Sequence, residues 1–224
     1  MGMFFLPVGL FMVVVVILVI FGAKAEKKRR DSFHIWAKRV GWTYLPGVNE
    51  GIPHQYSFLN RFREGYDREA HHVFEGEWQG YAARAFEYQY TTSHRDSDGD
   101  EHETTHHISV VLIQLERSFP ELRIYPEHFL SRIGQFLGGN DIDFESLEFS
   151  NAFTVHGDDR KFAYDFCNTK MMTYLLQHRK TGMELEYQTL ALFEDSYLQP
   201  DRIEPMLNQL VAMRERMPEY LFQD

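Results

Sequence analysis

The sequence contains a single cysteine, Cys167, among its 224 residues. A disulfide needs two cysteines, so an internal disulfide framework is excluded, and this low cysteine content is typical of proteins in a reducing compartment. No recognisable motif places a general base beside the thiol. We therefore interpret Cys167 as a small buried apolar residue rather than as a nucleophile.

The short motifs of common catalytic and nucleotide-binding sites are also missing. The sequence contains no G-x-G-x-x-G, no P-loop, no G-x-S-x-G and no C-x-x-C, the patterns that mark dinucleotide, phosphate, hydrolase and redox sites. No catalytic residue is therefore predicted, and a non-enzymatic protein is favoured over an enzyme.

Charge is absent from the first 23 residues, and then five of residues 24–30 are Lys or Arg. Residues 4–23 match the length of about 20 apolar residues that a helix needs to cross a bilayer. A cleaved signal peptide would carry its positive charges before the apolar core, whereas here they follow it. We therefore predict an uncleaved transmembrane anchor over residues 1–23, followed by a basic juxtamembrane segment at residues 24–30.

The basic segment also predicts the topology. Lys and Arg collect on the cytoplasmic side of a membrane span, so we expect the N-terminus outside and residues 31–224 inside, in a single-pass protein of the cell inner membrane. Residues 31–224 hold 18 basic and 32 acidic residues, a net charge of −14. Such a domain repels phosphate groups. Nucleic acid is therefore excluded as a partner, and the lipid bilayer is expected to be contacted through residues 4–23.

Hydrophobic periodicity and turn residues indicate both helices and strands downstream of the anchor. Helices are expected at 31–40 and at 201–217. Three more are expected between them: one from Pro126 to a stop at Gly138-Gly139, one from a cap at Asp158 or Asp159 to Phe166, and one that starts from a cap at Asn168. Strands are expected at 42–45, 69–78, 81–91, 107–116, 122–125, 149–155, 183–189 and 191–195, the last two as a hairpin. Residues 48–69 are ambiguous, with one helical turn at 57–61, and residues 92–105 read as a polar loop. Strands that follow one another directly predict an α+β domain with a largely antiparallel sheet and several packed helices.

One string, His102-Glu103-Thr104-Thr105-His106, spells H-E-x-x-H. In zinc proteases this spacing works because a helix places both His side chains on one face. Here the string leads into the strand expected at 107–116, and two His four residues apart in a strand lie about 13 Å from each other, too far to share one zinc. A weaker hypothesis keeps His94, His102 and His106 as candidate metal ligands. The favoured alternative is a solvated hairpin tip without metal.

Several segments resemble a family of uncharacterised bacterial membrane proteins with an N-terminal anchor and a conserved domain of unknown function. The resemblance covers most of residues 36–180 and rests on 41–44 (GWTY), 120–127 (PELRIYPE), 148–155 (EFSNAFTV), 159–164 (DRKFAY), Met171, Met172, Leu175 and Leu176. These positions are mainly structural. The resemblance implies a bacterial inner-membrane location and supplies no catalytic residues.

Three functional hypotheses follow from the sequence. The first is a membrane-tethered cytoplasmic domain, without cofactor, that binds a membrane or cytoplasmic protein as an interaction or scaffolding module. The second is a metal-dependent hydrolase that uses the His-rich hairpin and would contain zinc. The third is a small-ligand or lipid-sensing domain, which predicts a sizeable apolar pocket near the membrane-proximal face.

Overall fold

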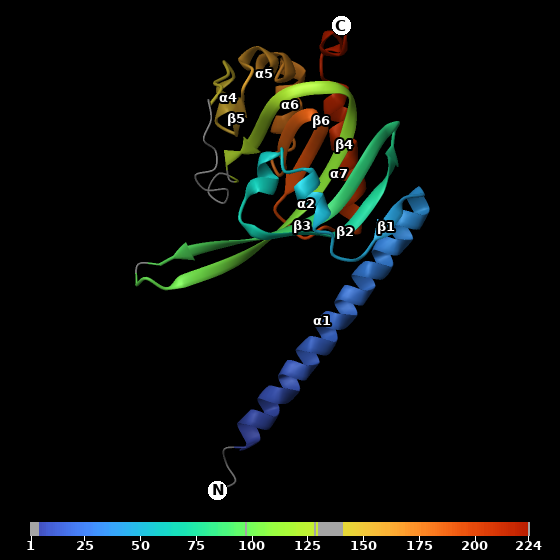
Figure 1. Ribbon diagram of the computed structural model, residues 1–224, viewed down its shortest axis with the longest axis vertical. Coiled ribbons are helices and arrows are strands. Elements are labelled where there is room, and N and C mark those ends of the chain that lie inside the picture. Colours follow the sequence, from blue (N-terminus) through green and yellow to red (C-terminus); the bar gives the residue numbers. More distant parts are fainter. Residues whose placement is uncertain (1–4, 97, 128, 130–140, 224) are drawn as a thin grey trace.

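The computed structural model describes residues 5–96, 98–127, 129 and 141–223 (Figure 1). Of residues 5–15, 18 and 19 it describes the backbone alone. The helix predicted to start at Pro126 falls mostly on residues 128 and 130–140, and so lies outside the described residues.

The N-terminal part of the described chain is one helix, α1 (Phe5–Val40). The prediction of a separate helix over 31–40 is therefore wrong. The Lys, Ala, Glu and Arg residues at 24–30 are strong helix formers, so the helix continues through the charged segment. It ends before Gly41, whose φ of 75° is the left-handed conformation that closes a helix.

Most side chains of the predicted anchor lie outside the described residues. Across the described part of the chain, no helix has both the length and the apolar character needed to cross a membrane. The anchor over residues 1–23 therefore stays a prediction.

The strands form an antiparallel sheet, as predicted. Along the described chain, β1 (Thr43–Leu45), β2 (Tyr66–Trp78), β3 (Tyr81–Arg95), β4 (Glu101–Pro126) and β5 (Phe153–Gly157) pair in this order. The sixth strand, β6 (Gly182–Glu194), pairs with β4. The β2–β3 hairpin turns at Gln79 and Gly80, both with positive φ, at the position that the sequence predicted.

β4 is one continuous strand, where the sequence predicted separate strands at 107–116 and 122–125. Its first half lies between β3 and β6 and its second half between β5 and β6. Register shifts near Phe119 let it bend between the two halves. β6 bends beside it at Tyr187, so the predicted hairpin of 183–189 and 191–195 is also wrong: both segments form one strand along β4.

The predicted loop at 92–105 is also mostly strand. Thr92–Arg95 continue β3 and pair with residues 101–104 of β4, which leaves a tip around Asp98 that Figure 1 shows projecting from the sheet. Thr occurs often in strands because its β-branched side chain fits a pleated surface, and Thr91 and Thr92 face Thr105 and Thr104 across this hairpin.

Short helices complete the described chain. They are α2 (Gly51–Gln55), η1 (Asn60–Arg63), α4 (Leu147–Ser150), α5 (Arg160–Phe166), α6 (Thr169–Leu176), α7 (Pro200–Arg214) and η3 (Glu219–Phe222). The strand predicted at 149–155 is wrong in its first half, because Ser146 caps α4 by accepting a hydrogen bond from the Phe149 amide. The caps of α5 and α6 and the extent of α7 follow the sequence prediction closely.

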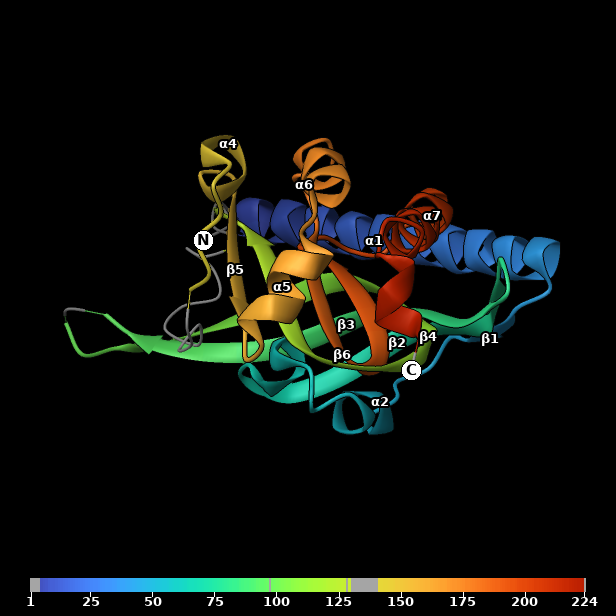
Figure 2. The ribbon, with the colours of Figure 1, turned by 90° about the horizontal axis from the view of Figure 1, so that it is seen from above.

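Two apolar cores lie on opposite faces of the sheet. Figure 2 shows α1, α6 and α7 on one side of the strands and α2 on the other. The larger core includes Phe33, Phe74, Leu192 and Met206. The smaller core lies under α2 and η1 and includes Phe62, Phe86 and Phe193. Cys167 is buried, and burial raises the pKa of its thiol, which agrees with its interpretation as an apolar core residue.

The start of α5 offers a matched test of helix capping. The Asp159 carboxylate accepts a hydrogen bond from the Phe162 amide at 3.0 Å, whereas Asp158 precedes the cap. We expect Asp159→Ala to lower the free energy of unfolding by about 1 kcal/mol and Asp158→Ala to change it little. Urea denaturation of both variants measures this. Equal losses in the two variants would contradict the assignment of the cap.

Candidate functional site

Helix α1 is built into the core of the domain by its C-terminal half. Phe33, Trp36 and Ala37 are buried, and the Trp36 indole donates a hydrogen bond to Glu204 of α7 at 2.9 Å. Arg39 forms an ion pair with the same carboxylate. The domain is therefore fixed to the end of a long helix rather than joined to it by a flexible linker.

Arg29, in the basic segment, forms a second attachment. Its Nε and Nη2 donate to the Leu198 carbonyl at 3.2 and 3.0 Å, and its guanidinium pairs with the nearly buried carboxylate of Glu87 on β3. Glu87 also accepts the Leu198 amide at 3.1 Å. Residues 24–30 were predicted to set the topology, and no local pattern in the sequence distinguishes Arg29 from its neighbours.

Two histidines surround this junction. His72 Nδ1 lies 2.7 Å from the Tyr44 hydroxyl and its Nε2 lies 3.4 Å from Glu26 of α1. His107 Nδ1 lies 3.6 Å from Glu87. Burial lowers the pKa of both imidazoles, which favours their neutral forms at pH 7. The cation that pairs with Glu87 and, at 3.5 Å, with Glu26 is therefore Arg29.

A buried ionic network fixes η1 to the sheet. The Arg61 guanidinium donates to both Glu64 oxygens at 3.0 and 2.9 Å and to Asp195 at 2.6 Å. The Arg61 amide donates to Glu184 at 3.0 Å, which also accepts the hydroxyl of Tyr125. Burial raises the pKa of Glu184 to about 7. The network connects η1 with β4 and both ends of β6.

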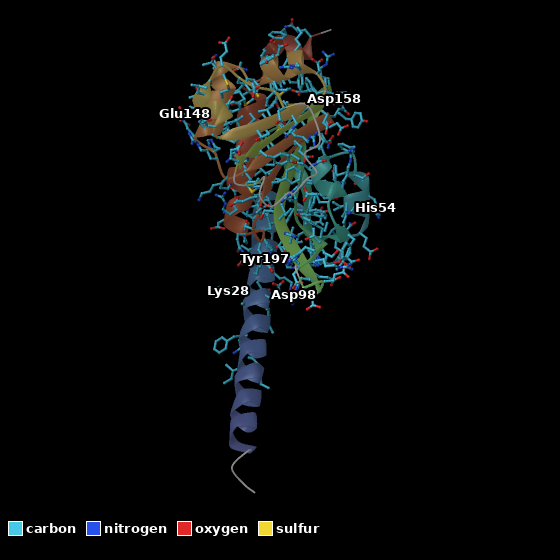
Figure 3. All side chains as sticks on the ribbon, turned by 90° about the vertical axis from the view of Figure 1, so that its left-hand side faces the viewer. Lys28, His54, Asp98, Glu148, Asp158 and Tyr197 are labelled. Carbon is cyan, nitrogen blue, oxygen red and sulfur yellow. The ribbon has the colours of Figure 1, made fainter. Side chains whose placement is uncertain are left out.

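An open groove of about 490 Å³ lies beside α2, on the face of the smaller core. Its floor is formed by β2, β3, β4 and β6, including Arg84, Leu112 and Thr189, and one wall is the segment from Gln55 to Phe58. Figure 3 shows this α2 side of the sheet, marked by His54, facing away from α1. We call this feature the α2 groove. Its lining residues are Gln55, Tyr56, Phe58, Glu75, Gly76, Ala82, Ala83, Arg84, Leu112, Gln114, Tyr187, Gln188 and Thr189.

Arg84 is held rigidly in the α2 groove. Its Nε lies 2.9 Å from Glu75, and its Nη1 donates to Gln55 at 2.7 Å and to the Tyr56 hydroxyl at 2.9 Å. Burial raises the pKa of Tyr56, so this hydroxyl keeps its proton at pH 7 and can donate it onward. The arrangement is a preformed set of hydrogen-bonding groups.

The three candidate metal ligands lie on one face of the β3–β4 hairpin. His94 and His102 are cross-strand partners with ring centroids 5.5 Å apart, and His102 Nε2 lies 2.9 Å from Asp96. His106 lies further along β4, where its Nε2 contacts Thr92 at 2.8 Å. Within the described residues, no group of three or more His, Cys, Asp or Glu side chains is arranged to hold a metal ion. The zinc hypothesis therefore stays a prediction.

No protein-family model matches the chain, and no curated protein matches it. Among solved structures, the chain is similar to the crystal structure of the mycobacterial trehalose monomycolate transport factor A, TtfA. The TM-score is 0.57 at 15% sequence identity, and the match covers 84% of this chain and 92% of that one. The two proteins share a fold. The bacterial family resemblance noted from the sequence stays a prediction.

Proposed function

We propose that this protein is a non-catalytic, membrane-tethered domain that takes part in lipid transport by binding a membrane-protein partner. In this proposal residues 4–23 cross the bilayer and residues 31–224 lie at its cytoplasmic face. The observation that carries the proposal is the continuity of α1 from the apolar segment into the core, together with the Arg29 attachment. A rigid connection of this kind is useful to a domain that must meet a partner at a fixed position near the membrane.

The fold comparison supports the lipid part of the proposal. The structural neighbour is a mycobacterial trehalose monomycolate transport factor. Its fold matches most of this chain and nearly all of its own length. A shared architecture is a reason to test a lipid-related role, although function resides in sites rather than in folds.

The position of the β3–β4 hairpin supports a membrane-protein partner. Figure 3 places Asp98, at the hairpin tip, at the height of Lys28 on α1. In this proposal the tip therefore lies on the membrane-proximal side of the domain. The tip is acidic, with Asp96, Asp98 and Asp100, and cytoplasmic loops of membrane proteins are rich in Lys and Arg. An acidic hairpin at this height complements such loops.

The test is the lipid distribution of native cells that lack the protein, measured by mass spectrometry of separated inner and outer envelope fractions. We expect an altered distribution that full-length protein restores and protein lacking residues 1–23 does not. Arg29→Ala should restore it poorly, because it loosens the domain from α1, whereas Arg30→Ala should restore it fully, because Arg30 is exposed. An unchanged lipid distribution in cells without the protein would overturn the proposal.

A further inference from the structure

The α2 groove presents hydrogen-bond donors and acceptors side by side. None of the contacts that hold Arg84 engages its Nη2 amino group. Gln114 donates from its Nε2 to the Thr189 hydroxyl at 3.2 Å, a contact that does not use the amide oxygen of Gln114. Gln188 adds a further exposed amide. A ligand whose groups both donate and accept hydrogen bonds, as hydroxyls do, matches this lining.

Aromatic rings stand at the rim of the same groove. Tyr187 is 56% exposed and packs against Phe58 with ring centroids 5.2 Å apart. Its φ of 51° is a left-handed conformation that a bulky residue rarely adopts. Strain of this kind persists where the surrounding structure holds it, often at ligand clamps. The exposed Tyr187 ring therefore offers an apolar face beside the polar floor.

The charges in the groove cancel. Glu75 and Arg84, the charged residues of its lining, are paired at 2.9 Å. Glu75 already neutralises Arg84, so a phosphate or carboxylate at Nη2 would add a second negative charge beside Glu75, and the acidic domain repels anions from a distance. A cation would be repelled by Arg84, which already neutralises Glu75. The groove therefore favours an uncharged ligand.

We infer that the α2 groove binds a neutral carbohydrate, with hydroxyls on Arg84, Tyr56 and Gln114 and a sugar ring against Tyr187. Sugar rings have apolar C–H faces and polar edges, which fit an aromatic rim over a polar floor. The volume of about 490 Å³ falls within the usual range of small-ligand sites, roughly 300–1,000 Å³. The sugar could be free or the headgroup of a glycolipid, since both present the same chemistry. The inference concerns binding alone and does not depend on the lipid-transport role.

The test uses the full-length protein in phosphatidylcholine nanodiscs, titrated with free neutral disaccharides such as trehalose and maltose and followed by calorimetry. We expect saturable binding that Tyr187→Ala weakens by about tenfold. Tyr220→Ala is the matched control, because Tyr220 is 53% exposed and lies outside the groove. Alanine keeps the positive φ of this position, but the Tyr187 side chain is mostly exposed, so this variant is expected to fold, and urea denaturation of both variants checks that it does.

A second arm identifies the source of the sugar. Nanodiscs that also contain a neutral glucosyl diacylglycerol should weaken the apparent affinity for free disaccharide if the headgroup occupies the groove, and leave it unchanged if the ligand is a free sugar. Either result supports the carbohydrate site. No saturable binding of the free disaccharides at millimolar concentration in phosphatidylcholine nanodiscs would overturn it. Binding that Tyr187→Ala leaves unchanged would overturn it as well. The protein could bind sugar while its loss leaves the cellular lipid distribution unchanged. That pair of results would uphold the carbohydrate site and reject the transport role.

Discussion

Replacing Arg61 with Met is expected to lower the free energy of unfolding by about 3–5 kcal/mol. The Arg61 side chain is 2% exposed and pairs with Glu64 and Asp195, which are themselves nearly buried. Met fills a similar volume but removes the guanidinium that both carboxylates share inside the protein. An uncompensated buried charge costs far more than the ion pair contributes to stability, so the loss comes from the acids that remain.

Urea denaturation at pH 7 measures this effect, with Arg63→Met as the control. Arg63 lies two residues away, is exposed and hydrogen-bonds two backbone carbonyls of the same segment. Its replacement should cost well under half as much. Adding Glu64→Gln to Arg61→Met should recover part of the stability, because it removes one of the stranded charges. A loss for Arg61→Met no larger than that for Arg63→Met would show that the network does not stabilise the fold.

The second large effect concerns pH. Glu184→Gln is expected to become more stabilising relative to wild type as the pH rises from 4.5 to 8. Burial raises the pKa of Glu184 to about 7 in the folded protein, from 4.5, so the folded state binds more protons than the unfolded state between these values. Wild-type stability therefore falls through this window and levels off above it. A shift of this size corresponds to about 3 kcal/mol.

Gln suits this position because its oxygen can accept the Arg61 amide and the Tyr125 hydroxyl, as Glu184 does. Its NH2 group replaces the Glu184 Oε2, a buried oxygen without a hydrogen-bond partner among the described residues. Urea denaturation at four pH values between 4.5 and 8 gives the difference between variant and wild type. Glu127→Gln, at an exposed residue, should give a flat difference. A flat difference for Glu184→Gln would mean that this carboxyl ionises normally.

The parts of the fold that depend on local rules could be predicted from the sequence. The turn at Gln79-Gly80 and the Asn168 cap of α6 are examples, because the residues that determine them are adjacent in the chain. The prediction that β4 and β6 are each divided into separate strands was wrong, because the residues that determine their bends are far apart in the chain. Each bend depends on the other strand, since Tyr187 faces Phe119 across the ladder. Pro120, next to the bend in β4, fits a bulge as well as the end of a strand, so it did not show that the strand continues.

The candidate site was missed for a similar reason. Arg29 and Glu87 are 58 residues apart in the sequence, and Arg61 belongs to a short polar segment that reads as exposed. The α2 groove is assembled from four strands and the α2 segment, so no motif could show it. The one sharp motif, H-E-x-x-H, was predicted at the end of a loop that leads into a strand, whereas it lies within β4, where its two Thr residues suit an extended backbone.

The arrangement of β4 has a consequence for synthesis on the ribosome. Val110, Val111 and Leu112 of β4 pair with residues of β6 that are made about 80 residues later. Until β6 emerges, the nascent chain carries a long apolar strand with one open edge, the kind of edge that recruits other strands. At this stage the growing protein is most exposed to aggregation. A chaperone that covers this edge would protect it until the sheet closes.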